Sequence, residues 1–381
     1  MLRNKHRLVF LFPALILVSC IKSYNPEIKS QDAYKLIVSG TITDYSGAQT
    51  ISISQASSVN KPMEIPVTGC KVTISDDQGH IFPMIDSANG NYGGWIDPQY
   101  LVAGNSFKVE ILTPDGSKIV SDYDRFSTSP EIDSVYYIRK DLATADPDEL
   151  LKGIQFYVDL DGNTTDSHFY RWEAVETWEY HSEYPIEWYY LFGIHRVFPA
   201  DYSKSICWST LPVPKIYLLS TERLTANKYK LFPLNFVDNK TPRLVYGYCL
   251  LAKQYSLSEA AYIYWDHLRS NSTSQGGLYE KQPLASKGNL HNCTHPDQDV
   301  LGFFGVSSVK SKRIFVRNVE NLVMEHPPSC AYHPVTQNEL SNFPDYMVYL
   351  KVDTITYVLE NGCVDCRELS GTIVKPDFWP Y

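Results

Sequence analysis

The side chains with the clearest chemical potential in this sequence are four residues near its end. Cys363 and Cys366 are separated by two residues, and Cys330 and His333 form a similarly spaced pair upstream. Pairs of this kind bind zinc, form a redox couple, or are oxidised to structural disulfides. The pair at 363 and 366 precedes a strand-like segment instead of opening a helix, which disfavours a redox site. The 29 residues between the two pairs match no familiar zinc finger, so we expect disulfides and keep zinc as the alternative.

Further cysteines along the chain could also form disulfides. Beyond an early cysteine at position 20, the remaining ones are Cys70, Cys207, Cys249 and Cys293. In an oxidising compartment, the six cysteines from Cys207 onward could form three bridges and leave Cys70 as a buried thiol. Six cysteines allow fifteen pairings, so spacing alone does not fix the connectivity. We expect Cys330 to pair with Cys363 or Cys366, and Cys249 to pair with Cys293.

Two further clusters have metal-binding residue types. Asp159, Asp161 and Asn163 have the alternation of a calcium loop, but Gly162 is its fourth residue, whereas an EF-hand needs glycine at the sixth. We therefore expect the segment around Gly162 to be a hairpin turn, with calcium as the alternative. The cluster at 291–295 (HNCTH) fits an exposed loop between strands better than a site. We expect neither a metal site nor a cofactor.

Familiar catalytic motifs do not occur in the sequence. It has no nucleophile elbow, paired-histidine metal helix, phosphate loop or dinucleotide fingerprint. Acidic residues are plentiful, yet nothing in their spacing selects a catalytic pair. The sequence therefore names no catalytic residue.

The first residues indicate export and lipid attachment. Basic residues precede an apolar run at 8–18, and the run of about 11 residues is too short to span a bilayer. The segment Leu17-Val18-Ser19-Cys20 matches a bacterial lipobox, in which the cysteine is acylated. We predict a signal peptide at 1–19 and a lipidated tether at 20–34 that anchors the protein through Cys20. The alternative is an ordinary signal peptide with an incidental cysteine.

Alternating apolar residues predict a β-sandwich over 35–128. Strands are expected at 35–43 and 49–57, and hairpins at 70–86 and 107–122 with turns at Asp77-Gln78-Gly79 and Pro114-Asp115-Gly116. Leu101, Gly104 and Phe107 resemble the corner of carboxypeptidase-regulatory-like and prealbumin-like (Ig-like) sandwiches. In that corner the glycine makes the turn, and the leucine and the aromatic residue fill the core.

Residues 129–381 are expected to form a larger β-rich domain with one packed α-helix. Ser256 and Glu259 have the spacing of a capping box, and apolar residues at helical spacing follow, which predicts a helix near 256–269. The fold class is therefore mainly β.

Aromatic residues are abundant, with 28 Tyr, 16 Phe and 7 Trp. Most must lie in sheet cores, and Tyr170, Trp172, Ala174 and Trp178 share one strand face that we expect to be core. The less regular stretch that follows is harder to bury. Its aromatic residues form our candidate exposed binding surface, namely Tyr184, Trp188, Tyr189 and Tyr190.

Several blocks together resemble a family of Bacteroidota outer-membrane lipoproteins catalogued as domain of unknown function 4249. They are the lipobox, the sandwich at 35–128, and the segments 252–268, 287–316 and 363–379. The resemblance implies an outer-membrane lipoprotein encoded beside TonB-dependent transporters. It carries over no catalytic residue. Ser370-Gly371 departs from the family, in which a Gly-Gly pair is usual.

These observations favour a non-catalytic binding or accessory lipoprotein that works with an outer-membrane transporter. The alternatives are an envelope hydrolase of glycans or peptides and a purely structural envelope protein. A net charge of −9 without long basic runs argues against nucleic acid. A glycan or peptide ligand is compatible with the aromatic composition. We expect the outer membrane as location, and the sequence leaves open whether the body faces the periplasm or the medium.

Overall fold

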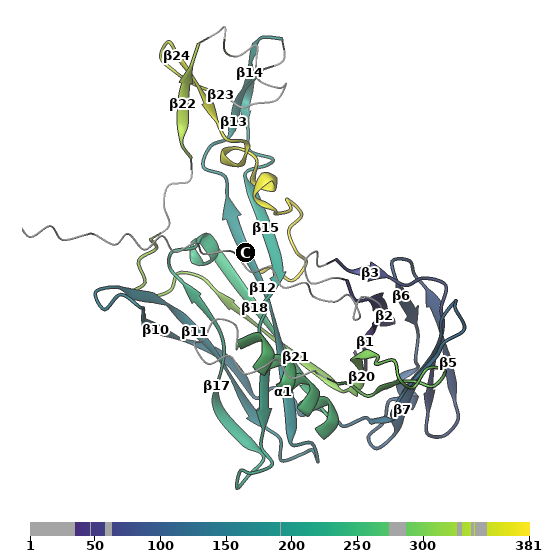
Figure 1. The fold of residues 1–381 in the computed structure, drawn as a ribbon. Helices are drawn as coiled ribbons and strands as arrows, with labels where there is room; N and C mark the ends of the chain where they lie inside the picture. The colour runs from purple at the N-terminus through teal and green to yellow at the C-terminus, as the bar shows by residue number, and fades with distance from the viewer. Residues whose placement is uncertain are drawn as a thin grey trace, which may run out of the picture.

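The computed structural model describes residues 35–45, 47–57, 63–190, 192–273, 287–325, 330–336, 339 and 349–381. These residues form two β-sandwiches and a slender third part, the distal module, which projects from the second sandwich (Figure 1). The predicted mainly β class with an α-helix is confirmed. The predicted signal peptide, Cys20 and the tether lie outside the described residues. Within the described ranges, no helix has the length and apolar character needed to cross a membrane.

The N-terminal sandwich is one sheet that folds onto itself, with strand order β19-β8-β7-β4-β5-β6-β2-β1-β20. Both predicted hairpins, β4–β5 and β7–β8, are confirmed. A short 3-10 turn follows β6 at Pro98–Tyr100. The strands are β1 (Leu36–Thr43), β2 (Gln49–Gln55), β3 (Ile65–Pro66), β4 (Lys71–Asp76), β5 (Ile81–Asp86), β6 (Asn91–Gly94), β7 (Ser106–Leu112), β8 (Lys118–Ser121), β9 (Asp124–Arg125), β19 (Leu290–Asn292) and β20 (Leu301–Ser307).

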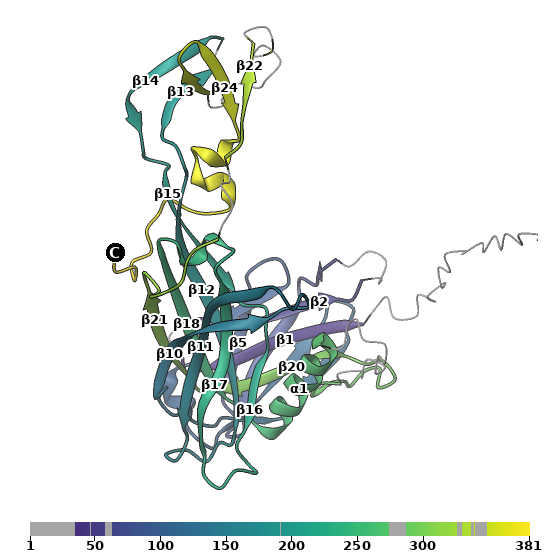
Figure 2. The ribbon, with the colours of Figure 1, turned by 90° about the vertical axis from the view of Figure 1, so that its left-hand side faces the viewer.

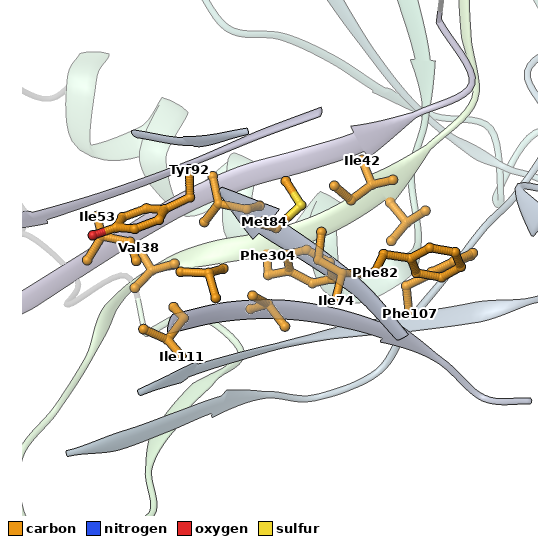
Figure 3. Packing of buried hydrophobic residues seen from close by; sticks show 14 of the residues in the cluster. Val38, Ile42, Ile53, Ile74, Phe82, Met84, Tyr92, Phe107, Ile111 and Phe304 are labelled. Carbon is orange, nitrogen blue, oxygen red and sulfur yellow. The ribbon is translucent and has the colours of Figure 1, made fainter. Parts of the chain in front are cut away.

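The core of this sandwich follows the period-two pattern of its strands. Val72 and Ile74 of β4 point inward while their neighbours on the strand are more exposed. Figure 3 shows Ile74 among residues from β1, β5, β7 and β20, and Val72 belongs to the same buried cluster. The predicted corner is also confirmed, because Leu101 and Phe107 are buried and Gly104 has a φ of +95°. A positive φ of this size favours glycine, since it has no Cβ.

The sandwich does not end at residue 128, as the predicted boundary supposed. β20 pairs in parallel with β1, so that Val38 lies opposite Gly302 and Ile42 opposite Val306. Phe304 is fully buried in the core of the N-terminal sandwich. On the other edge, β19 pairs with β8. A parallel pair between segments this far apart needs a long crossover and leaves no local sequence signal, which explains why the boundary was wrong.

The second sandwich has two facing sheets, of order β10-β11-β17 and β15-β12-β18-β21, with β16 paired to β12. The predicted core face of β12 is confirmed: Tyr170, Trp172 and Ala174 are buried, and Trp178 packs partly buried against the same cluster. A 3-10 turn lies at Pro242–Leu244. The strands are β10 (Ser134–Ala143), β11 (Leu150–Asp161), β12 (Phe169–His181), β15 (Ile206–Pro212), β16 (Tyr217–Ser220), β17 (Lys228–Asp238), β18 (Gly247–Ser256) and β21 (Val309–Val316).

The connection around Gly162 is neither a hairpin turn nor a calcium loop. β11 and β12 do not pair, because this connection carries the chain from one sheet to the other. Its backbone is held by Asn227, whose Nδ2 donates to the Gly162 carbonyl at 2.8 Å. Lys230 contacts Asp159 and Lys228 contacts Asp161, so lysines neutralise the two carboxylates that calcium would need.

The helix α1 (Glu259–Thr273) begins later than predicted. Ser256 is the last residue of β18, and the cap is Ser258, whose Oγ accepts from the Ala261 amide at 3.1 Å. The proposed capping box of Ser256 and Glu259 is therefore wrong. The start of the helix packs where the sandwiches meet, with Ala261 in one buried cluster with Tyr255 of β18 and Phe303 of β20 (Figure 2).

The distal module consists of a two-stranded and a three-stranded sheet (Figures 1 and 2). The predicted strand-like segment after Cys366 is not a strand and makes only a bridge between Thr372 and Trp208. The elements of the module are β13 (Ile186–Tyr190), β14 (Ile194–Asp201), β22 (Tyr332–Val335), β23 (Tyr349–Val352), β24 (Ile355–Leu359) and two 3-10 turns at Asn361–Cys363 and Cys366–Leu369.

Candidate binding surface

Two disulfides fix the base of the distal module. Cys207 of β15 is bonded to Cys366, and Cys330 is bonded to Cys363. Cys363 and Cys366 therefore act as two separate staples and form no redox couple with each other. The zinc alternative is also contradicted, since three of its four proposed ligands are in disulfides. Pairing of Cys330 with Cys363 is one of the two outcomes that the sequence predicted.

The other predicted pairing is wrong. Cys249 is a buried free thiol on β18, and Cys293 is an exposed free thiol beside β19. They lie in different sandwiches, which the sequence does not show. Burial raises the pKa of the Cys249 thiol. Cys70 is a buried free thiol, as expected.

Hydrogen bonds reinforce the same base. The Tyr180 hydroxyl at the end of β12 donates to the Cys366 carbonyl at 2.8 Å. The backbones of Trp208 and Thr372 exchange hydrogen bonds at 2.8 and 2.9 Å. These contacts join the long strands of the second sandwich to the module, so that the module is a braced extension of that sandwich.

Tyr184, the first predicted surface residue, belongs to this braced region. Its side chain packs partly buried against Leu359, Cys363 and Val364, and its backbone N–H donates to the Cys363 carbonyl at 2.9 Å. Burial raises the pKa of Tyr184. Its role in the structure is to hold the two sheets of the module together, so we remove it from the candidate surface.

Trp188 and Tyr189 lie on opposite faces of the hairpin β13–β14. Trp188 pairs across the strands with Arg196, whose guanidinium lies 5.7 Å from the Trp188 ring centre. Lys351 of β23 approaches the same ring at 5.8 Å. Tyr189 stacks on His195 at 5.3 Å. The side chain of Tyr190 lies outside the described residues, so this candidate stays a prediction.

The most exposed aromatic side chains of the hairpin are two that the candidate surface omitted. Phe192 lies in the connection between β13 and β14 and is 91% exposed, and Phe198 on β14 is 83% exposed. Phe192 has a φ of +52°, a strained conformation for a bulky residue. Residues with a strained backbone conformation cluster at functional sites. Phe192 combines such a conformation with an exposed apolar side chain. The sequence signal for the exposed position of Phe192 is its place directly before Gly193.

We define the hairpin surface as Trp188, Phe192, Arg196, Phe198 and Lys351. The guanidinium of Arg196 lies 5.4 Å from the Phe198 ring centre as well as close to Trp188, which makes a ladder of aromatic, cation and aromatic side chains. Trp, Phe and Arg are the residue types enriched at protein interfaces. The hairpin surface can therefore bind a partner without any reacting group.

A hollow lies among strand ends and loops of the N-terminal sandwich. It is a cleft of about 780 Å³, and its lining includes Gln55, Val67, Asp115, Asp297 and Asp299. Hydrogen bonds from Thr113 and Ser117 hold the pKa of Asp115 below its usual value. Asp115 is thus kept ionised, which suits binding better than proton donation. Among the side chains that the structure describes, no three His, Cys, Asp or Glu residues are placed to hold a metal ion.

Two sandwiches and a disulfide-braced module define a multidomain β protein. The chain belongs to the family described as "Domain of unknown function (DUF4249)", whose profile matches residues 21–313. This confirms the family that the sequence resembles. The matched range ends before β22, so the C-terminal half of the distal module lies beyond it.

Comparisons with individual proteins add little. No curated protein matches the chain. Among solved structures, trypsin-activated alpha-2-macroglobulin from Escherichia coli matches with 8% identity and a TM-score of 0.18. The match covers 83% of this chain, and the chain spans 18% of that protein's length. A likeness at this TM-score carries no argument about fold or function.

Proposed function

We propose that this protein is a lipid-anchored envelope protein that binds another envelope protein through the hairpin surface. Acyl chains on Cys20 would hold it at the outer membrane, and a TonB-dependent transporter is the partner class that the family resemblance implies. The protein acts as a binding or accessory module, and its body sets the position of the hairpin relative to the membrane.

The observation that carries this proposal is the exposure of Phe192 and Phe198 on a module braced by two disulfides. Exposed aromatic side chains are hydrated unfavourably, and covering them with a partner lowers the free energy by about 25 cal/mol per Å² of apolar surface. The bracing lowers the entropy that the hairpin would lose on binding. Both features favour a preformed interface.

Purification of the full chain from its native cells in mild detergent tests the proposal. We expect Phe192→Ser combined with Phe198→Ser to remove a membrane protein that co-purifies with the wild type. The matched control is Ile81→Ser with Ile85→Ser, which removes two exposed apolar side chains from β5 of the N-terminal sandwich. Equal recovery of the partner with both double variants would contradict the proposal.

The cleft near Asp115 supports a second candidate, an envelope hydrolase of glycans or peptides. Its volume suits a small ligand, and its lining carries the carboxylates Asp115, Asp297 and Asp299. If this candidate holds, Asp297→Asn with Asp299→Asn should abolish hydrolysis of envelope glycans or peptides. Loss of partner binding in that variant, without any hydrolysis in the wild type, would instead assign the cleft to binding.

A further inference from the structure

We infer that the hairpin surface recognises an acidic segment of a partner protein, in which a carboxylate is flanked by apolar side chains. This inference rests on the proposed function and names the chemistry of the partner. The carboxylate would meet Arg196 and Lys351, and the apolar side chains would cover Phe192 and Phe198.

The hairpin surface carries two positive charges, on Arg196 and Lys351. Arg196 and Lys351 approach Trp188 at 5.7 and 5.8 Å, and no carboxylate among the described residues forms an ion pair with either cation. Two cations beside one ring, neither with an ion-pair partner in the described part of the chain, attract an anionic group.

Arg196 lies close to two aromatic rings. Its guanidinium carbon is over the Trp188 and Phe198 rings, 5.7 and 5.4 Å from their centres. Packing of this kind uses the faces of the guanidinium and leaves its N–H edges available. Those edges donate two parallel hydrogen bonds to a carboxylate, a pairing that a neutral amide reproduces poorly.

Two aromatic side chains of the hairpin surface are uncovered. Phe192 and Phe198 are 91% and 83% exposed, and the Phe198 ring centre lies 5.4 Å from the Arg196 guanidinium. An interface of this composition has an apolar anchor with a charged pair at its rim. The complementary segment therefore carries an acidic residue and at least one aliphatic or aromatic residue close to it in the chain.

Two alternatives fit the hairpin surface less well. Binding to an anionic membrane through charge uses clusters of about four to eight basic residues, and this surface has two. Addition of a partner strand to β14 would need backbone N–H groups along its edge, and Pro199 lacks one. Recognition through side chains is the arrangement that remains.

Fluorescence anisotropy with the full chain in neutral detergent tests the inference. The probe is a fluorescein-labelled peptide of repeated Glu-Leu-Glu-Phe, compared with versions that carry Gln or Lys in place of Glu. We expect the Glu peptide to bind about tenfold more tightly than the Gln peptide, and salt to weaken it. Arg196→Gln should lower the affinity about threefold to tenfold, and Lys71→Gln, which removes an exposed charge from β4, should leave it unchanged.

Several outcomes would overturn the inference. These are equal affinity for the Glu and Gln peptides, wild-type affinity in Arg196→Gln, and equal binding to polyglutamate or to phosphatidylglycerol vesicles. Retention of both disulfides in Arg196→Gln shows that its module is intact. If no peptide binds while Phe192→Ser with Phe198→Ser still removes the co-purifying protein, the acidic chemistry is wrong and the proposed function stands. If neither effect occurs, both fall.

Discussion

Asp124 is a buried carboxylate at the contact between the two sandwiches. It accepts a hydrogen bond from the Ser258 hydroxyl at the start of α1 and one from the Val306 amide of β20 at 2.7 Å. Burial raises its pKa to about 6, because these hydrogen bonds offset only part of the lost hydration. A single side chain thus links β9 of the first sandwich, the helix, and β20, the strand by which the chain returns to the first sandwich.

The raised pKa predicts how Asp124 changes stability with pH. Its pKa is about 6 in the folded protein and about 3.9 in the unfolded chain. The stabilisation that the protonated Asp124 carboxyl gives the folded protein is therefore fully present below pH 3.9. It is lost as the pH rises through 6. The free energy of unfolding of the wild type, minus that of Asp124→Asn, should be about 2–3 kcal/mol larger at pH 4 than at pH 7.

Urea unfolding of both proteins at each pH measures this difference. The subtraction cancels the other carboxylates, several of which have lowered pKa values and act in the opposite direction. A constant difference between wild type and Asp124→Asn from pH 4 to 7 would show that Asp124 is not held as described.

Substitutions of the neighbouring residues Ser370 and Gly371 should change stability in opposite directions. Ser370 has a φ of +68°, which costs a non-glycine residue about 1–2 kcal/mol, so Ser370→Gly should stabilise the protein by about 0.5–1 kcal/mol after the entropy cost of glycine. Gly371→Ala should destabilise it, since the new Cβ would lie 1.9 Å from the Tyr180 hydroxyl. Thermal unfolding of both variants would contradict this account if the two changes had the same sign.

At the scale of the element, the sequence predicted hairpins well and cap positions less well. The turns at Asp77-Gln78-Gly79 and Pro114-Asp115-Gly116 carry their own conformational signal, and both hairpins form. In Ser256-Leu257-Ser258-Glu259, two serines compete for the cap, and continuation of β18 through Ser256 decides between them. That choice depends on sheet pairing, which local spacing does not encode.

The candidate surface shows the same limit. Aromatic density directed the candidate surface to the hairpin β13–β14, because Trp188 and Tyr189 lie in β13. It did not separate Tyr184, which packs beneath the module, from Phe192 and Phe198, which face solvent. Exposure depends on which strands from residues 330–360 fold back onto the hairpin. Those contacts are tertiary and have no signature in the hairpin's own sequence.

The two staples of the distal module should contribute unequally to stability. Cys207 and Cys366 are 159 residues apart, whereas Cys330 and Cys363 are 33 apart. Under the loop-entropy model, replacing the first pair by serine should cost about 1.4 kcal/mol more than replacing the second. Guanidinium unfolding of the two double variants measures this. A larger cost for the shorter loop would show that local packing, and not chain entropy, dominates.

At the scale of the whole molecule, the chain passes through the N-terminal sandwich twice. The first pass supplies β1 to β9, and the second supplies β19 and β20 after the chain has built most of the second sandwich. Leu290, Phe304 and Val306 are buried in the first core. The two sandwiches are therefore interdependent in folding, although each has its own core.

This interdependence predicts the behaviour of fragments. Residues 35–128 alone should fail to unfold cooperatively, because β1 lacks its parallel neighbour and the core lacks Phe304. Addition of a synthetic peptide of residues 287–307 should restore a cooperative transition in circular dichroism. The matched control is the same peptide with Phe304→Ser and Val306→Ser. Cooperative unfolding of residues 35–128 without any peptide would contradict the crossover.

We propose that the hairpin surface contacts a partner protein in the envelope. Site-specific photo-crosslinking in living cells tests it most directly, with benzoylphenylalanine placed at position 192 or at the exposed control position 85. We predict one discrete crosslinked protein from position 192 and none from position 85. An absence of crosslinks at 192, from protein that is correctly exported and has both disulfides, would contradict the claim.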